Sequence, residues 1–529
     1  MQLEKERVNS MKLKQFFSLV LALAMCLSLA ACGEKDQPSK NDGDSGSADS
    51  IVIGRAFDSD NLDPVNMVGN YNIWILNMML EGLVQTNDKG TEIIPCLAED
   101  WTISDDGLTY TFHLKEGVCF SDGTPVTGED WVFSFQRAMK SPDARWYFTV
   151  ENFESVEAPD DSTFVLHLKE VSATTLADLA MWTCGVQSKA HYDKVGEDGY
   201  ADGFIGTGAY MLKDWKKGES MEFVANPYYH VEGLPKTQNL TFRVIADDSS
   251  RTMQLQSGDI DVAINLSMDS LYQLEQDKRV NVHPSISAET QFLALNTKNQ
   301  YLSNDKVREA LCMATDPTAI TQVATFGYGT PTATVMPGSS TYIPQDIPVN
   351  TPDVEGAKAL LADAGYPDGF SLDLMICSAK SVEESIATLV KEQWAQIGVE
   401  VNIVSYEKVT YTEKLYGTDF DVVVDYWSDD ICDPSEFMTF LCDFDVCSGF
   451  DTNYKVPGIE ELNKQAKAEL DSEKRTALYH EILHKIDDAH IYVPICTIPY
   501  ASAESTSISG FVQTPLGNLR LSNMTKTVG

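Results

Sequence analysis

Four consecutive segments in the second half of the chain decide the fold class: FSLDLMI at 370–376, VEESIATLVKEQWAQI at 382–397, VEVNIV at 399–404 and FDVVVDYW at 420–427. Three of them are short apolar runs of strand length, whereas the second repeats apolar residues at helical spacing and stops at Gly398. Strands that alternate with a helix of this length predict βαβ units and parallel pairing. The sequence therefore predicts an α/β fold.

The turn after the last of these strands, residues 428–434, is the best-placed ligand site on physical grounds. In open α/β sheets, ligands bind beyond the carboxyl ends of the strands. The turn carries Asp429, Asp430 and Asp433, the last of them directly before Pro434. Position alone leaves two interpretations open: the aspartates contact a ligand, or they only build the turn.

A different pattern precedes this region. Residues 108–114 and 162–168 alternate apolar and polar side chains with period two, and each run follows an Asp-rich turn. Such half-buried strands predict an antiparallel element, and such an element can form a small domain of its own. Thr127 and Asp130 are spaced as a capping box, which predicts that a helix starts there.

The N-terminus has the pattern of an exported lipoprotein. Lys12 and Lys14 precede an apolar core at 16–29, and Leu29-Ala30-Ala31-Cys32 resembles a bacterial lipobox. We predict a signal peptide over 1–31, lipid attachment at Cys32, including palmitate, and a flexible tether over 32–50, where Gly, Ser, Asp and Asn dominate. The protein would then be extracytoplasmic, anchored to the outer face of the cytoplasmic membrane.

Composition excludes some partners. The chain has 39 Lys and Arg against 79 Asp and Glu, a net charge of −40, so we expect no nucleic-acid binding, which needs basic patches. No CxxC spacing occurs among the cysteines, which removes the zinc-ribbon and thioredoxin interpretations. Cys442 and Cys447 could form a small disulfide loop or remain buried thiols.

An ordered set of motifs resembles extracellular solute-binding family 5, the receptors of ABC importers. Residues 97–101 (LAEDW), 104–115 (SDDGLTYTFHLK) and 120–127 (FSDGTPVT) together look like the signature block of that family. Further matches are spread along the chain, at 62–64, 80–83, 206–210, 257–261, 307–308, 364–370 and 433–434. The resemblance covers essentially the whole mature body.

The resemblance implies a fold. It is a two-lobed periplasmic-binding-protein-like fold of class II, with mixed sheets, a hinge between the lobes and an extra subdomain inserted in the first lobe. We expect lobe I over 51–288 with the subdomain at about 89–203, lobe II over 289–496, and a return to lobe I over 497–529. Closure of the lobes would bury the ligand between them.

The resemblance also implies a ligand anchor. Asp430 holds the position at which peptide-binding members have an aspartate that pairs with the α-ammonium group of the peptide. Trp427 would supply a flat apolar wall, and Tyr426 and Ser428 are further candidates beside it.

Asn70 and Tyr71, in the loop after Asp63-Pro64, are weaker candidates for the opposite wall. The implied function is a monomeric receptor without cofactor that captures dipeptides or oligopeptides and delivers them to ABC permease subunits. A nickel chelate or oligosaccharide as ligand, or a role as peptide sensor, stays open.

An enzyme interpretation competes through an HExxH match. His480 and His484 could hold zinc with Glu481 as base, because residues i and i+4 share a helix face. However, position 487 is Asp where the longer motif needs Gly, and apolar residues on the other side of the same helix turn both histidines away from the core. We therefore expect neither a metal nor an enzymatic activity.

Overall fold

The computed structural model describes residues 49–337, 340–378, 380–447 and 452–527. The predicted signal peptide, Cys32 and nearly all of the predicted tether lie outside the described residues. Within the described part, no helix is both long and apolar enough to cross a bilayer.

The segments that predicted the fold class form a six-stranded mixed sheet in the order β14-β18-β13-β17-β15-β16. Its strands are β13 (Glu289–Leu295), β14 (Thr330–Pro331), β15 (Phe370–Cys377), β16 (Val399–Tyr406), β17 (Val422–Ser428) and β18 (Tyr492–Thr497). β15 pairs in parallel with both β16 and β17, whereas β13 runs antiparallel to β17 and β18. The predicted α/β fold is confirmed.

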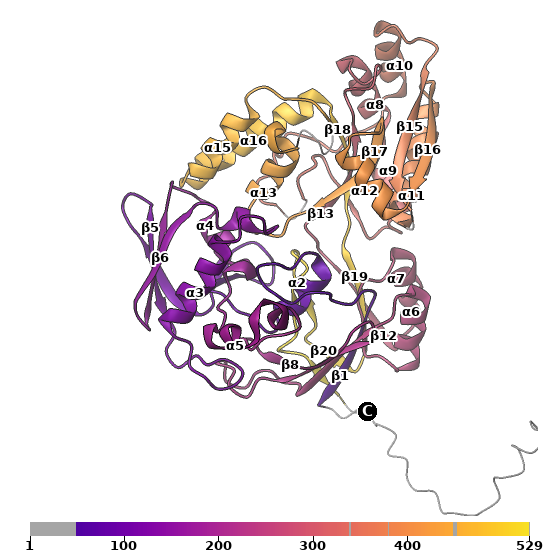
Figure 1. The fold of residues 1–529 in the computed structure, drawn as a ribbon. Coiled ribbons are helices and arrows are strands. Elements are labelled where there is room, and N and C mark those ends of the chain that lie inside the picture. The colour runs from indigo at the N-terminus through magenta and orange to yellow at the C-terminus, as the bar shows by residue number, and fades with distance from the viewer. Residues whose placement is uncertain (1–48, 338–339, 379, 448–451, 528–529) are drawn as a thin grey trace, which may run out of the picture. The chain divides into compact units, whose positions relative to one another are not determined.

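Both faces of this sheet are buried, which explains its continuous apolar strands. Along β13, Leu293 and Leu295 join one core while Phe292 and Ala294 join the other. The first core is covered by α8 (Asp305–Ala314), α9 (Pro317–Ala324), α10 (Val354–Asp363) and α11 (Ser381–Ala395), which lie beside β15 and β16 (Figure 1). The second is covered by α12 (Lys408–Tyr416), α13 (Ser435–Phe437), η3 (Met438–Cys442), α15 (Ile459–Ala468) and α16 (Ser472–Ala489), with the short α14 (Phe444–Cys447) beside η3.

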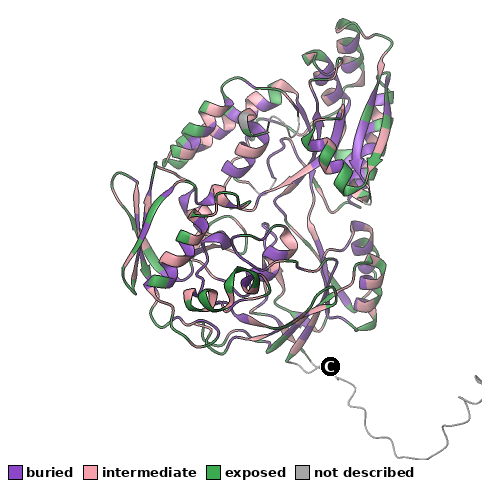
Figure 2. Ribbon diagram, viewed as in Figure 1, coloured by how far each residue is buried: buried purple, intermediate pink, exposed green. Residues whose placement is uncertain are grey.

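These helices are amphipathic, and their outer faces are exposed (Figure 2). In α11 the buried residues Ile386, Val390 and Trp394 recur at a spacing of four and face the sheet. Gly365 and Gly398 follow α10 and α11 with φ of 94° and 84°, a backbone region that glycine adopts without strain. The helix ends predicted at these two glycines are confirmed.

A second, seven-stranded sheet has the order β12-β19-β11-β1-β10-β9-β8. Its strands are β1 (Ser50–Arg55), β8 (Tyr210–Lys216), β9 (Ser220–Ala225), β10 (Asn239–Val244), β11 (Val262–Ala263), β12 (Val280–Ser285) and β19 (Tyr500–Ser505). The helices α2 (Asn70–Leu76), α5 (Lys189–Ala201), α6 (Asp248–Ser257) and α7 (Met268–Leu274) contribute buried residues to its cores. Short two-stranded sheets are formed by β2 (Val84–Thr86) with β3 (Ile93–Pro95), β20 (Ile508–Ser509) with β23 (Thr525–Lys526), and β21 (Val512–Gln513) with β22 (Leu519–Arg520).

The period-two segments form a separate four-stranded antiparallel sheet, β4-β5-β7-β6. Its strands are β4 (Ala98–Ile103), β5 (Thr109–Leu114), β6 (Phe153–Asp160) and β7 (Thr163–Leu168), with α3 (Gly128–Met139), α4 (Thr175–Leu179), η1 (Tyr147–Thr149) and η2 (Trp182–Cys184) nearby in the chain. Phe112, Phe135 and Phe164 pack together in its core. The predicted capping box of α3 is present, because Thr127 and Asp130 each accept from the backbone of the other.

The chain passes between the two large sheets at residues 286–288, after β12, and again at 498–499, before β19. These two passages are bonded to each other. The hydroxyl of Ser287 donates to the carbonyl of Ile498, and the amide of Ile498 donates to the carbonyl of Glu289 at 3.3 Å.

Candidate ligand-binding site

The topology of the six-stranded sheet gathers several chain segments at one edge. β17 lies between β13 and β15; it is parallel to β15 and antiparallel to β13. The ends of β15 and β17 and the start of β13 therefore meet, and Glu289 pairs with Ser428 in the ladder. Lys380 follows β15, and the turn at 429–434 follows β17.

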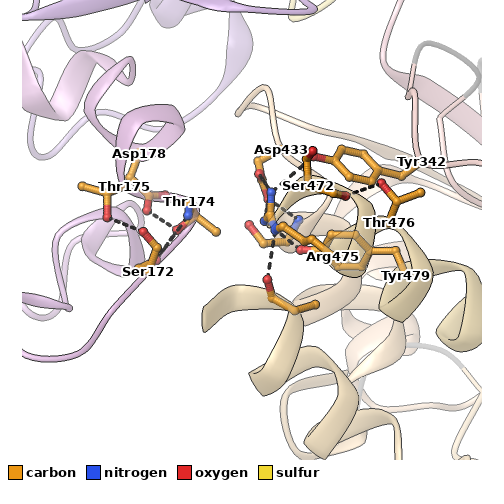
Figure 3. A network of polar contacts seen from close by, with 12 residues as sticks. Ser172, Thr174, Thr175, Asp178, Tyr342, Asp433, Ser472, Arg475, Thr476 and Tyr479 are labelled. Atoms are coloured by element: carbon orange, nitrogen blue, oxygen red, sulfur yellow. Dashed lines mark hydrogen bonds and ion pairs between the residues drawn. The ribbon is translucent and has the colours of Figure 1, made fainter. Parts of the chain in front are cut away.

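The three aspartates of this turn have different partners. Asp433 forms a two-pronged ion pair with Arg475 of α16, with Nη–Oδ distances of 2.7 and 2.8 Å, and both side chains are only 7% exposed. Figure 3 shows this pair together with the hydroxyls of Tyr342 and Tyr479, to which Arg475 donates at 3.4 and 2.9 Å. Asp433 is thus fully occupied within the protein.

Asp429 is also occupied. It is buried and accepts a hydrogen bond of 2.9 Å from the indole Nε1 of Trp427. By contrast, the carboxylate of Asp430 makes no hydrogen bond or ion pair with any other described residue. Of the three, only Asp430 is left to meet a ligand.

The backbone of the turn is held independently of the Asp430 side chain. Glu436 of α13 accepts from the amides of Asp430 at 2.8 Å and of Ile431 at 3.2 Å. Burial raises the pKa of Asp430 to about 7, and the charge of Arg145 opposes this only partly. A carboxylate in such surroundings gains strongly from a cationic partner, because burial removes much of its solvation by water.

Lys380 lies at this edge among several acidic groups. Nζ of Lys380 lies 4.0 Å from the centre of the Tyr426 ring and 2.5 Å from a carboxylate oxygen of Glu383. Glu289 accepts from Gln291 at 3.0 Å, and burial raises the pKa of Glu289 to about 7, with the charge of Lys380 acting against it. The local field therefore favours a positively charged ligand group.

Aromatic rings flank the acidic groups. Trp427 stacks on Phe440 with a centroid distance of 5.5 Å, and Trp74 of α2 meets Tyr500 edge to face at 5.6 Å. Burial raises the pKa of Tyr500, and the charges of Glu289 and Asp430 raise it further, so these carboxylates lie near its hydroxyl. Rings of this kind offer apolar surface to a ligand that carries its charge elsewhere.

The predicted site residues fall into two groups. Tyr426, Trp427, Ser428 and Asp430 lie together at the end of β17 and in the turn after it. Asn70 and Tyr71 begin α2, and the hydroxyl of Tyr71 donates to Asp60 at 3.2 Å.

Among the described residues, no hydrogen bond or ion pair joins Asn70 or Tyr71 to the turn after β17. From α2 it is Trp74 that contacts Tyr500, a residue of the acidic edge. The ligand role of all six predicted residues stays a prediction.

Sequence reasoning did not find Lys380, Glu289, Trp74 or Tyr500. Lys380 follows a predicted strand, so the rule that selected the turn after 420–427 could have selected it too. Glu289 and Tyr500 lie at the passages between the two sheets, close to the predicted lobe boundaries. Their place at the site depends on where the chain passes from one sheet to the other. A local sequence pattern does not show where that happens.

The HExxH segment lies on α16. Tyr479, Ile482 and Leu483 are buried against the sheet, and His484 forms an ion pair with Asp346 at 3.3 Å. Within the described ranges, no group of three or more His, Cys, Asp and Glu side chains is arranged to hold a metal ion. Cys442 is buried, and the side chain of Cys447 lies outside the described residues.

The fold and this site together define a solute-binding protein of the two-lobed α/β class, and comparison with known proteins gives the family. The sequence profile of bacterial extracellular solute-binding proteins, family 5 (middle), matches residues 92–445. The chain therefore belongs to this family of binding proteins.

Individual relatives extend the match over nearly the whole chain. Heme-binding protein A of Haemophilus influenzae is 29% identical over 96% of this chain and 98% of its own length. The dipeptide-binding protein of Escherichia coli is 29% identical over 84% of this chain and 88% of its own. The periplasmic binding protein DppA of Helicobacter pylori, solved in complex with the peptide STSA, superimposes with a TM-score of 0.76 at 27% identity, covering 90% of this chain and 98% of that one.

Proposed function

We propose that this protein is the substrate-binding receptor of an ABC importer and that it captures peptides through their α-ammonium group. One observation carries the proposal: Asp430 is the carboxylate of its turn that has no partner among the described residues, whereas Asp429 and Asp433 have theirs. The dipeptide-binding relative and the peptide-bound neighbour support the choice of ligand.

The ammonium group of a bound peptide would replace the water that Asp430 loses on burial. The pair would be strong because it is formed in a site with few competing waters. Trp427, Trp74 and Tyr500 would offer apolar walls to the first side chains. The acidic surplus at the sheet edge also disfavours a ligand whose charge is purely negative.

The two lobes would correspond to the two large sheets, with boundaries near residues 288/289 and 496/497. In support, all strands from β13 to β18 belong to the six-stranded sheet, and the seven-stranded sheet takes its strands from both sides of that stretch. The passages at 286–288 and 498–499 would act as the hinge, so that ligand binding shifts the protein toward a closed form that the permease recognises. The protein would be a monomer without enzymatic activity.

Lipidation of Cys32 would keep the receptor at the outer face of the cytoplasmic membrane, beside the permease. The proposal rests on the lipobox-like segment at 29–32 and on the tether composition that follows it. A peptide sensor would use the same site and the same anchor.

Asp430→Asn tests the function. The variant removes the charge and keeps the shape, so we expect peptide affinity to fall by at least about 2 kcal/mol in titration calorimetry. Asp368→Asn is the matched control, because Asp368 is exposed and precedes the opposite end of β15. Unchanged affinity in Asp430→Asn would refute the anchor.

A further inference from the structure

A cavity of about 500 Å³ lies beside the turn after β17; Ile431 and Glu436 line it, whereas Asp430 does not. One side is lined by Phe148 of η1, by Glu151 and Asn152, and by residues that follow β7, among them Asp178 of α4. The other side is lined by Ile431 and by residues of α13, η3 and α15. Its volume is within the range of small-ligand pockets.

The two sides of this cavity are in direct contact at its rim. The amide of Ala173 donates to the carbonyl of Lys467 at 2.7 Å. Phe148 and Phe440 meet edge to face with a centroid distance of 5.5 Å, which gives the cavity an apolar wall. A ligand here would touch both sides at once.

The lining is predominantly acidic. Among the described residues, the carboxylates that line the cavity come from Glu151, Glu170, Asp178, Glu436, Asp443 and Glu460. The lysines that line it are Lys169, Lys464 and Lys467. The acidic excess attracts cations, and the phenylalanine wall accommodates an aliphatic chain.

A buried acceptor in the lining lacks a donor. Asn463 of α15 is only 3% exposed, and its Oδ1 has no hydrogen-bond partner among the described residues. Buried side-chain acceptors are normally satisfied, so this oxygen indicates a donor other than the described residues. It is an observation independent of the acidic lining, and it points to the same chemistry.

Asp178 is one of the acidic groups of the lining whose ionised form the surrounding protein disfavours. It accepts from the hydroxyl of Thr174 at 2.6 Å, and Figure 3 shows this pair facing the side that carries Asp433 and Arg475. Burial raises the pKa of Asp178 to about 8, and the charge of Asp433 raises it further while that of Lys467 lowers it. A cation near Asp178 would relieve this repulsion.

We propose that this cavity binds an organic cation, an ammonium or guanidinium group on an aliphatic chain, with Asp178 as counter-ion and Asn463 as hydrogen-bond acceptor. Such a group has two sources: a free organic cation, or a basic side chain of the captured peptide. The second source rests on the proposed function, and Ile431, which follows Asp430 directly, lines the cavity.

The first arm of the test uses the full-length protein with Asp430→Asn, in which the anchor of the first site is absent. Cadaverine is titrated by calorimetry, with 1,5-pentanediol as the uncharged probe of the same length. For a free cation we expect cadaverine to bind, the diol not to bind, and cadaverine affinity to fall at least tenfold when Asp178→Asn is added. Asp178→Asn keeps an acceptor for the hydroxyl of Thr174. Glu170→Gln is a second variant, at an exposed position, that does not disturb the core.

The second arm uses tripeptides of alanine with lysine or norleucine at each position in turn. For a basic side chain we expect one lysine peptide to bind the wild-type protein at least tenfold better than its norleucine counterpart, and Asp178→Asn to abolish that preference. Suppose that peptides bind, but that neither the lysine preference nor the cadaverine binding changes when Asp178 or Glu170 is substituted. The cation site is then overturned, while the proposed function stands. If no peptide binds and cadaverine binding still depends on Asp178, the peptide function fails and the site stands.

Discussion

Asp430 and Asp433 lie in the same turn, three residues apart, and have opposite relations to the protein around them. Asp433 is held by both Nη atoms of Arg475, in a pair that tyrosine hydroxyls complete. Asp430 is half-buried, its pKa is raised to about 7, and its carboxylate forms no hydrogen bond or ion pair with another described residue. The comparison teaches that two aspartates of one turn can differ in role: one stabilises the fold, and the other is left for a ligand.

The largest expected effect concerns the paired aspartate. Arg475→Met leaves Asp433 buried without its cation, which should lower the free energy of unfolding by about 3–5 kcal/mol. Denaturant titration of the ligand-free protein measures this loss, with Arg279→Met as control because Arg279 pairs with Asp277 on the surface and is 70% exposed. A loss in Arg475→Met no greater than in the control would remove the distinction between the two aspartates.

Asp429 allows a test of intermediate size. Trp427→Phe removes the indole donor and leaves the buried Asp429 without this hydrogen bond, so we expect a loss of about 1–3 kcal/mol in unfolding free energy. The loss should shrink as the pH falls, because burial already raises the pKa of Asp429 and the protonated acid needs the donor less. Equal losses at neutral and acidic pH would show that the hydrogen bond contributes little.

The smallest effect, and one of opposite sign, is expected at Asp430. Its folded-state pKa of about 7 lies above the ordinary carboxyl value of about 4, so the ligand-free fold loses stability as the pH rises from about 4 to about 7. Asp430→Asn should therefore raise the unfolding free energy by about 1 kcal/mol at about pH 8. The gain should shrink as the pH falls and disappear near pH 4, where Asp430 is protonated in the folded and the unfolded state alike; a loss of stability at pH 8 would place Asp430 with Asp433 as a structural residue.

Much of the fold was predictable because several segments carry clear local patterns of strands, helices and helix ends. Residues 370–376 and 399–404 are apolar strands around an amphipathic helix that ends at a glycine, and the structure has them as β15, α11 and β16. The capping box at Thr127 and Asp130 needs only neighbours in sequence, so it too could be read directly.

The site was predictable only where one chain segment carries it. The strand-end rule selected the turn after β17, and the family resemblance then selected Asp430 and Trp427. The bond of Asp433 to Arg475 spans 42 residues, and that of Ser287 to Ile498 spans 211, so no local pattern reports either. Which of the three aspartates is unpaired is therefore a property of the tertiary structure alone.

The central claim is that Asp430 is the ionised partner of the ligand's ammonium group, and the pH dependence of peptide affinity tests it most directly. With a free-protein pKa of about 7, lowering the pH from about 7 to about 5.5 protonates Asp430 and should weaken wild-type affinity about tenfold, while the peptide amine stays charged. In Asp430→Asn, which retains Glu289 with its pKa of about 7, binding should be weak and should depend on pH over this interval much less than in the wild type. Wild-type affinity that does not change, or a variant that keeps the wild-type dependence, would contradict the account.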